Sequence, residues 1–190
     1  MTRASKVSAS LGFHVRTGRA VAIVLRGPAD APSILFRRDV SLWSSELGDK
    51  GPYHTVLELP WPEAVRAAQP VVRAVEGIAI DCVKALLDDA MEAGCRIGAV
   101  GIVGSMGQDP AKIGNPHIRA HAAEGQLFRH AVEVAAQASG LSYLSHAPEE
   151  VAISAGAERA AKVQALGKGL IHPWRTEERC ATLAAWICLS

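Results

Sequence analysis

Two histidines, His117 and His121, stand four residues apart in a stretch with helical periodicity, and Glu124 follows three residues later. Residues four apart lie on one face of a helix, so both imidazoles could reach the same ion. Zinc and similar divalent metals accept imidazole and carboxylate ligands. The spacing therefore predicts a divalent-metal site at His117, His121 and Glu124, with solvated or capping side chains as the alternative. Ile118 follows His117, so the H-E-x-x-H pattern that supplies a metalloprotease base is absent.

Four arginines, Arg16, Arg19, Arg37 and Arg38, fall on or beside three expected strands near the start of the chain. Gathered on one side of a sheet, they would form a basic edge that contacts nucleic-acid phosphates. The alternative is that they are ordinary surface residues. The chain has 20 basic and 19 acidic residues and a net charge of +1. Because phosphate-driven binding needs a basic excess, this balance argues against tight nonspecific DNA binding unless the charges are segregated.

A glycine-rich loop over residues 104–110 follows an apolar stretch and contains Ser105. Loops at the carboxyl ends of strands commonly bind ligands, and glycines let backbone N–H groups approach an anion. The loop matches neither the P-loop nor the dinucleotide fingerprint, so we expect an ordinary tight loop. Ser105 would need a base such as His14 or His146 to act as a nucleophile, and no G-x-S-x-G elbow surrounds it.

The elements that would position these residues begin with strands. Alternating and β-branched residues predict strands over 7–14, 19–26 and 33–43. The turn 15–18 and the proline-containing loop 27–32 join them. Three consecutive strands with short connections favour an antiparallel meander.

A long helix is predicted to end near Gly94, with Pro70 as either a kink or its true beginning. Residues 53–59 before it suggest a short strand or an extended connector. The apolar face of the helix would be made by Val71, Val75, Ile78, Cys82, Leu86 and Met91.

Strands and helices alternate in the second half of the chain. Strands are expected over 96–103, as a buried central strand, and over 141–146. Helices are expected from the N-cap Asn115 to Ser139, over much of 148–170, and from the N-cap Thr176 to Ser190. The sequence thus predicts one α/β domain over residues 1–190. Its three-strand meander is followed by α-β-α-β-α, which gives a mixed sheet with helices on both faces.

This order of elements is that of the ribonuclease H-like fold, and several stretches resemble the RuvC resolvases. Leu11-Gly12-Phe13-His14 and Gly18 are similar to that family's first strand and turn. The stretches 125–151 and 161–164 resemble its glycine-ended helix, the strand and turn that follow, and the next helix. Residues 183–188 resemble the family's C-terminal ending. The resemblance implies a ribonuclease H-like fold over most of the chain.

RuvC-like nucleases hold two divalent metals with four carboxylates, and the metals activate water and stabilise the leaving oxygen. His14 stands at the first of these positions, and Val103 to Ser105 offer nothing acidic at the second. Glu178 and Ala181 stand at the last two. Imidazole, glycine and alanine do not replace the hard oxygen ligands that magnesium needs. The resemblance therefore implies a degenerate member, with His14 and Glu178 at the catalytic positions and without the two-metal nuclease reaction.

The resemblance also implies a role in binding structured or branched DNA, with Lys162 joining the arginines as a contact, or a role as a dimerising scaffold. We expect a homodimer, and no cofactor apart from a divalent metal ion. One alternative is a RuvC-like Holliday junction endonuclease that uses substituted ligands. Another is a metal-assisted hydrolase rebuilt around His14, Ser105, His117, His121 and Glu178.

Four cysteines, Cys82, Cys95, Cys180 and Cys188, are widely spaced in apolar surroundings and form no C-x-x-C pair. They are expected to be buried free thiols that pack as small hydrophobes. No apolar run approaches the roughly 20 residues that span a membrane, and the first ten residues lack the apolar stretch of a signal peptide. The sequence thus predicts a cytoplasmic protein without a membrane partner.

Overall fold

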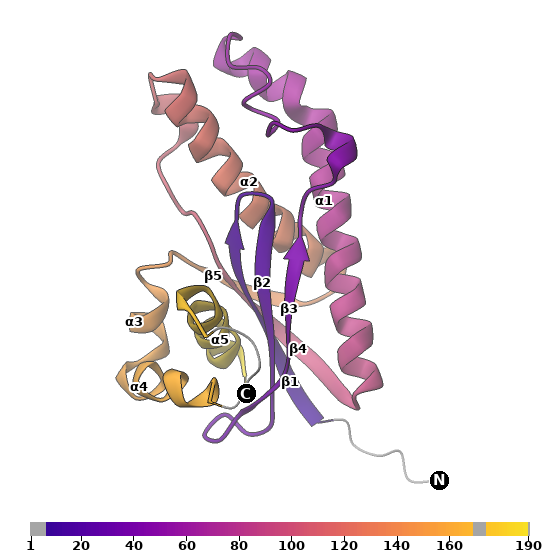
Figure 1. Cartoon of the computed structure of the whole chain (residues 1–190), viewed down its shortest axis with the longest axis vertical. Helices are drawn as coiled ribbons and strands as arrows, with labels where there is room; N and C mark the ends of the chain where they lie inside the picture. Colours follow the sequence, from indigo (N-terminus) through magenta and orange to yellow (C-terminus); the bar gives the residue numbers. More distant parts are fainter. Residues whose placement is uncertain (1–6, 169–173, 190) are drawn as a thin grey trace.

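The computed structural model describes residues 7–168 and 174–189. Five strands form one sheet in the order β3-β2-β1-β4-β5 (Figure 1). Strands β1 to β3 form an antiparallel meander, whereas β4 is parallel to β1 and β5 is parallel to β4. The predicted mixed sheet is therefore confirmed. The bounds of the strands are Val7–Arg16 for β1, Arg19–Arg26 for β2, Ser33–Ser41 for β3, Cys95–Val103 for β4 and Ser142–His146 for β5.

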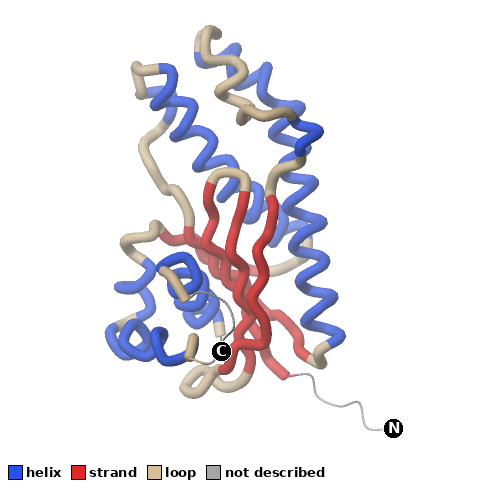
Figure 2. Tube along the Cα trace, in the orientation of Figure 1, coloured by secondary structure: helices blue, strands red, loops and turns tan. Residues whose placement is uncertain are grey.

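Helices cover both faces of the sheet, as the sequence predicted (Figure 2). Helices α1 and α2 share one hydrophobic core with the sheet, and α3, α4 and α5 pack on the opposite face in two smaller cores. The helices are α1 (Trp61–Glu92), α2 (Pro116–Ala138), α3 (Val151–Ala155), α4 (Ala157–Leu166) and α5 (Thr176–Cys188), with 3-10 helices η1 (Ser45–Leu47) and η2 (Pro110–Lys112).

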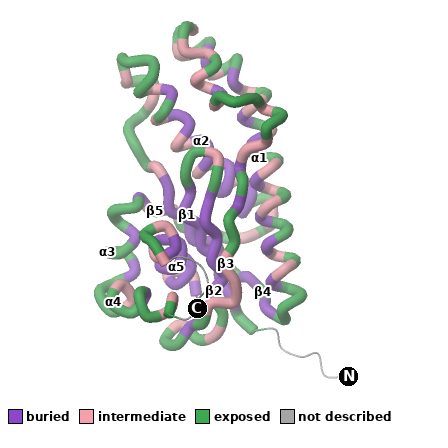
Figure 3. Tube along the Cα trace, in the orientation of Figure 1, coloured by how far each residue is buried: buried purple, intermediate pink, exposed green. Residues whose placement is uncertain are grey.

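The alternation of side chains along β1 decides which residues meet α5. Leu11 and Phe13 point into the core shared with α1 and α2. The residues between them point to the other face, because successive side chains of a strand alternate. Ser10 donates a hydrogen bond to the carbonyl of Ala185 in α5 at 2.6 Å, so this face of β1 lies against α5. His14 therefore also lies on the α5 side, and it is buried. Figure 3 shows that much of the sheet between the two layers of helices is buried.

Two paired glycines let α5 lie unusually close to the sheet. Gly12 of β1 and Gly101 of β4 are direct partners in the parallel ladder. A Cβ at Gly12 would lie 1.9 Å from the carbonyl oxygen of Ala181, and a Cβ at Gly101 would lie 2.2 Å from that of Ala184. Both distances are far below a van der Waals contact, so only glycine fits at these positions. The close approach fixes the start of α5 at the edge of the sheet where β1 and β4 end.

The structure corrects two expectations about α1 and the segment before it. Residues 53–59 form consecutive turns, not a strand or an extended connector. The helix begins at Trp61, not at Pro70, and continues through Pro70 without a break. Of the predicted face, Val75 and Leu86 are buried, Met91 is exposed, and the other three residues are partly buried. The observed buried face is continuous across Pro70, so packing offsets the lost backbone hydrogen bond. This face is made by Ala64, Ala68, Val72, Val75, Ala79, Val83, Leu86 and Ala90.

Two further differences lie near the C-terminus. The stretch 148–170 is divided into α3 and α4 by Gly156, whose φ of 85° is a conformation that side chains other than glycine rarely adopt. The N-cap of α5 is Arg175, and Thr176 is the first helical residue. The predicted helix ends at 170 and 190 lie outside the described residues. Of the cysteines, all free, Cys95 and Cys180 are buried and Cys82 and Cys188 partly buried.

The N-terminal ends of α1 and α2 project beyond the sheet (Figure 1). They are in contact there, because the guanidinium of Arg119 in α2 lies over the ring of Trp61 in α1. Tyr53 packs on Trp61 with ring centroids 5.3 Å apart, so the turns over 53–59 cover this projecting end. Over residues 7–168 and 174–189, no helix combines the length and apolar character that crossing a membrane requires.

Candidate functional site

A cleft of about 1090 Å³ opens at the edge of the sheet where the parallel strands β1, β4 and β5 end. Ligands of open α/β sheets commonly bind beyond the carboxyl ends of the strands. The cleft brings together six residues that the sequence singled out. These six are His14, Arg16, Arg19, Arg37, Ser105 and Glu178.

His14 is almost completely buried at the end of β1, with a relative exposure of 4%. Its Nδ1 atom has no hydrogen-bond partner among the described residues. Burial lowers the pKa of His14, and the nearby Glu177 carboxylate partly opposes this shift. Burial therefore favours the neutral imidazole of His14, and its Nδ1 atom in the cleft wall meets no hydrogen-bonding group of the described residues.

Glu178 is a buried carboxylate in the first turn of α5, and both of its oxygens are already engaged. Oε1 accepts a hydrogen bond from Nη2 of Arg37 at 2.9 Å. Oε2 accepts one from the backbone N–H of Arg175 at 3.0 Å, which caps the helix. Arg37 also pairs with Asp39, two residues further along the same face of β3. Glu178 thus holds a guanidinium group and a helix end together.

Glu177, the neighbour of Glu178, is paired in the same way. Its two oxygens accept hydrogen bonds from Nη1 and Nη2 of Arg19 at 2.8 and 2.9 Å. The hydrogen bond with Arg19 lowers the pKa of Glu177. Arg16 lies at the limit of an ion pair with Glu177, at 4.0 Å, and its side chain is 60% exposed. Arg16 is therefore less restrained than Arg19 or Arg37.

Two residues expected to contact nucleic acid lie elsewhere. Arg38 follows Arg37 in β3 and so points to the opposite face, where it pairs with Asp89 of α1 at 3.3 Å. Lys162 lies on α4 and pairs with Glu158 one turn earlier at 2.6 Å. Neither side chain lines the cleft. Of the four arginines that the sequence singled out near the start of the chain, three lie on the side of the cleft and Arg38 lies on the opposite face of the sheet.

His117, His121 and Glu124 are not part of the cleft. They lie in the first half of α2, which projects beyond the sheet (Figure 1). Glu124 is buried and accepts hydrogen bonds from the backbone N–H groups of Tyr53 and His54, each at 3.1 Å, and from Nδ1 of His54 at 2.9 Å. A hydrolase centre that combines His117 and His121 with His14, Ser105 and Glu178 is therefore not assembled.

Three residues near these sites were missed in the sequence, and two had a readable signal. Asp39 shares a strand face with Arg37 because they are two residues apart. Arg175 precedes the first helical residue and so holds the capping position. His54 had no such signal, because an isolated histidine in a loop reveals nothing about which helix it will meet.

The donors in the cleft do not fit the pair of magnesium ions that the RuvC resemblance implies. Magnesium needs several oxygen ligands in octahedral geometry. At the positions that the resemblance implies, Glu178 accepts hydrogen bonds from two arginines, His14 offers nitrogen, and Val103 at the end of β4 has no polar side chain. Glu177 is paired with Arg19. Three further carboxylates line the cleft, those of Asp39, Glu149 and Glu150, and Asp39 pairs with Arg37. The positive charge beside Glu177, Glu178 and Asp39 is thus supplied by guanidinium groups. Among the described residues, no group of three His, Cys, Asp or Glu side chains is arranged to hold a metal ion in the positions that these side chains occupy in the structure.

No protein-family model matches the chain, and no curated protein matches it. Solved structures do. RuvC of Thermus thermophilus in complex with a Holliday junction substrate is similar with a TM-score of 0.50 and 16% identity, over 96% of this chain and 92% of that one. A second Thermus thermophilus RuvC structure matches with a TM-score of 0.50 and 14% identity, over 94% and 92%. Together with the strand order and the helices on both faces, this likeness identifies the fold as ribonuclease H-like.

Proposed function

We propose that the chain binds structured or branched nucleic acid in its arginine-lined cleft and does not cut it by the two-metal reaction. The observation that supports both halves is the pairing of Arg19 with Glu177 and of Arg37 with Glu178 at the end of the sheet. Guanidinium groups there compete with metal ions for the carboxylates. The same groups have the planar geometry that recognises phosphate.

The exposed arginines are the groups that would meet phosphate. The side chains of Arg16 and Arg19 are 60% and 53% exposed, so either can turn toward a ligand. Arg37 is 11% exposed and remains with its two carboxylates. A similar fold occurs in a RuvC structure that contains a Holliday junction substrate, which supports nucleic acid as the class of ligand.

The charge balance of the cleft sets the expected strength of binding. Two exposed arginines contacting two phosphates predict a slope of log K against log salt of roughly −2. The glutamates and Asp39 in the same wall would repel further phosphates. We therefore expect micromolar binding that weakens only moderately with salt, unlike the steep dependence of a strongly basic protein.

Fluorescence anisotropy with a labelled four-way junction and a duplex of the same sequence tests binding. The wild-type chain should bind the junction at about micromolar concentration in low salt. The double variant Arg16→Ala, Arg19→Ala should weaken binding at least about tenfold and flatten the salt slope. Arg38→Ala is the matched control, because this arginine lies on the other face of the same sheet and should have no effect.

Cleavage is assayed on the same junction with magnesium or manganese present. Stable binding without product agrees with the proposal. Metal-dependent cutting that is lost in Glu178→Gln would refute the second half, and absence of binding at about 100 μM protein in low salt would refute the first. The homodimer expected from the sequence stays a prediction, which sedimentation velocity on the same protein would test.

A further inference from the structure

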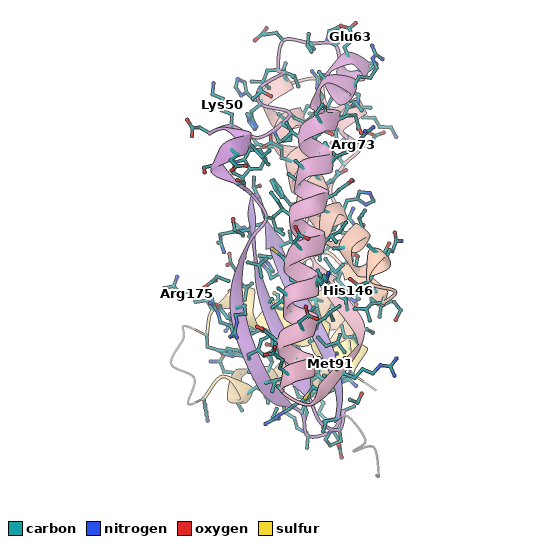
Figure 4. All side chains as sticks on the ribbon, turned by 90° about the vertical axis from the view of Figure 1, so that its right-hand side faces the viewer. Lys50, Glu63, Arg73, Met91, His146 and Arg175 are labelled. Carbon is teal, nitrogen blue, oxygen red and sulfur yellow. The ribbon has the colours of Figure 1, made fainter. Side chains whose placement is uncertain are left out.

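Three histidines from two separate segments meet at the projecting end of the molecule. His117 and His121 lie one turn apart near the start of α2, and His54 comes from the turns over 53–59. The His54 ring lies 4.4 Å from the ring of His121 and 6.1 Å from that of His117, between centroids. Lys50 and Glu63 flank the turns over 53–59 in the sequence. Figure 4 shows that both residues lie far from Arg175 of the cleft along the long axis of the molecule.

These ring distances are close to those of imidazoles that share one ion. A zinc–nitrogen bond is about 2 Å long, so two imidazoles on a tetrahedral ion have ring centres roughly 5 Å apart. The distance from the His54 ring to the His121 ring is shorter than this separation, and the distance to the His117 ring is longer. As they stand, the three side chains are not yet arranged around an ion. His117 and His121 are exposed, so their side chains have room to change rotamer and turn their nitrogens toward His54.

Glu124 orients the third histidine in the way that metal sites commonly do. Its carboxylate only accepts hydrogen bonds, so the short contact with Nδ1 of His54 places the ring proton on Nδ1. Nε2 is then the nitrogen with a free lone pair for a ligand. Histidines that bind metals usually donate their other ring N–H to a carboxylate or carbonyl in this manner. Glu124 is buried, and Gly51 packs against its carboxylate so closely that a Cβ would lie 2.2 Å away.

We propose that His54, His117 and His121 bind one zinc-class divalent ion, and that Glu124 is the positioning residue for His54 and not a ligand. Three imidazoles suit zinc, cobalt or nickel and do not suit magnesium. The fourth position of the ion is left to water. The ion would join the turns over 53–59 to α2, and would stabilise the projecting end of the molecule by linking two segments far apart in the sequence.

Zinc titration of the full, tag-free, metal-free chain tests this site, with a chromophoric chelator as competitor. One zinc should bind with a Kd of about 1 μM or tighter, and cobalt should give the visible absorption of a tetrahedral ion. His54→Ala, His117→Ala and His121→Ala should each weaken binding at least about tenfold. His130→Ala is the matched control, because this exposed histidine of α2 pairs with Glu133 and lies more than two turns beyond His121.

Glu124→Gln tests the positioning role separately. Gln keeps an acceptor for the backbone N–H groups of Tyr53 and His54, so the metal-free protein should keep its Tm. Zinc affinity should fall about 10- to 100-fold. The ¹⁵N shifts of the His54 ring should show loss of the fixed Nδ1–H tautomer in this variant.

Two results would overturn the inference. If His54→Ala binds zinc as tightly as the wild type, only a surface pair of histidines on α2 holds the ion. If the wild type binds no zinc at about 100 μM, no site exists. The cleft variant Arg16→Ala, Arg19→Ala should bind zinc normally, so failure of the nucleic-acid proposal would leave this test unaffected.

Discussion

Replacement of Gly101 by alanine should destabilise the protein strongly, because the new methyl group would collide with the backbone of α5. The added Cβ would lie 2.2 Å from the carbonyl oxygen of Ala184, and the helix must move by about 1.2 Å to restore the 3.4 Å of an ordinary contact. Overpacking of a core costs about 1–3 kcal/mol. A helix backbone cannot rotate away as a side chain can, so we expect a cost near the upper end, about 3 kcal/mol.

Urea unfolding of Gly101→Ala, Gly98→Ala and the wild type measures this cost. Gly98 is in the same strand, but a Cβ there meets nothing within 4 Å. Gly98→Ala should therefore change the free energy of unfolding by no more than about 1 kcal/mol, through the entropy of the unfolded chain. Equal midpoints for the two variants, at equal m-values, would show that α5 is not held against the sheet as described.

Two further predictions concern the cleft. Glu178→Ala should lower the free energy of unfolding by about 3 kcal/mol, since it leaves Arg37 half-paired and the start of α5 uncapped; a loss below about 1 kcal/mol in urea unfolding would contradict this. Burial lowers the pKa of His14, so below its usual value of about 6.5 the unfolded chain binds a proton that the folded chain does not. Stability should therefore fall as the pH drops from about 7 toward the folded pKa, and an unchanged pH dependence in His14→Gln would show that this proton is not responsible.

The sheet was readable from the sequence because its signals are local. Alternation over β1 to β3, the small apolar run of β4 and the Asn115-Pro116 start of α2 each specify an element within a few neighbours. The buried face of α1 was harder to read from the sequence, because alanines such as Ala64 and Ala68 form much of it. An alanine reveals little about burial until the partner helix is known.

The site was predictable to a similar extent. That His14 and Glu178 would share one site followed from the RuvC resemblance, whereas the arginine partners of the carboxylates depend on contacts more than 140 positions apart in the chain. Likewise, the spacing of His117 and His121 was visible, but the hydrogen bonds that turn Glu124 toward His54 come from a separate segment. The spacing of residues along one helix predicts which side chains share a face of that helix. Only the tertiary fold determines which other segments contact that face.

The mismatch in length between α1 and the sheet has a mechanical consequence. Thirty-two residues of helix extend about 48 Å, whereas the nine residues of β4 extend about 30 Å. Roughly the first third of α1 is thus supported by α2 and a few turns of chain, not by the central sheet. We therefore expect this end to open locally at a lower free energy than the sheet does. A ligand that binds this projecting end would make its local opening rarer without changing the central sheet.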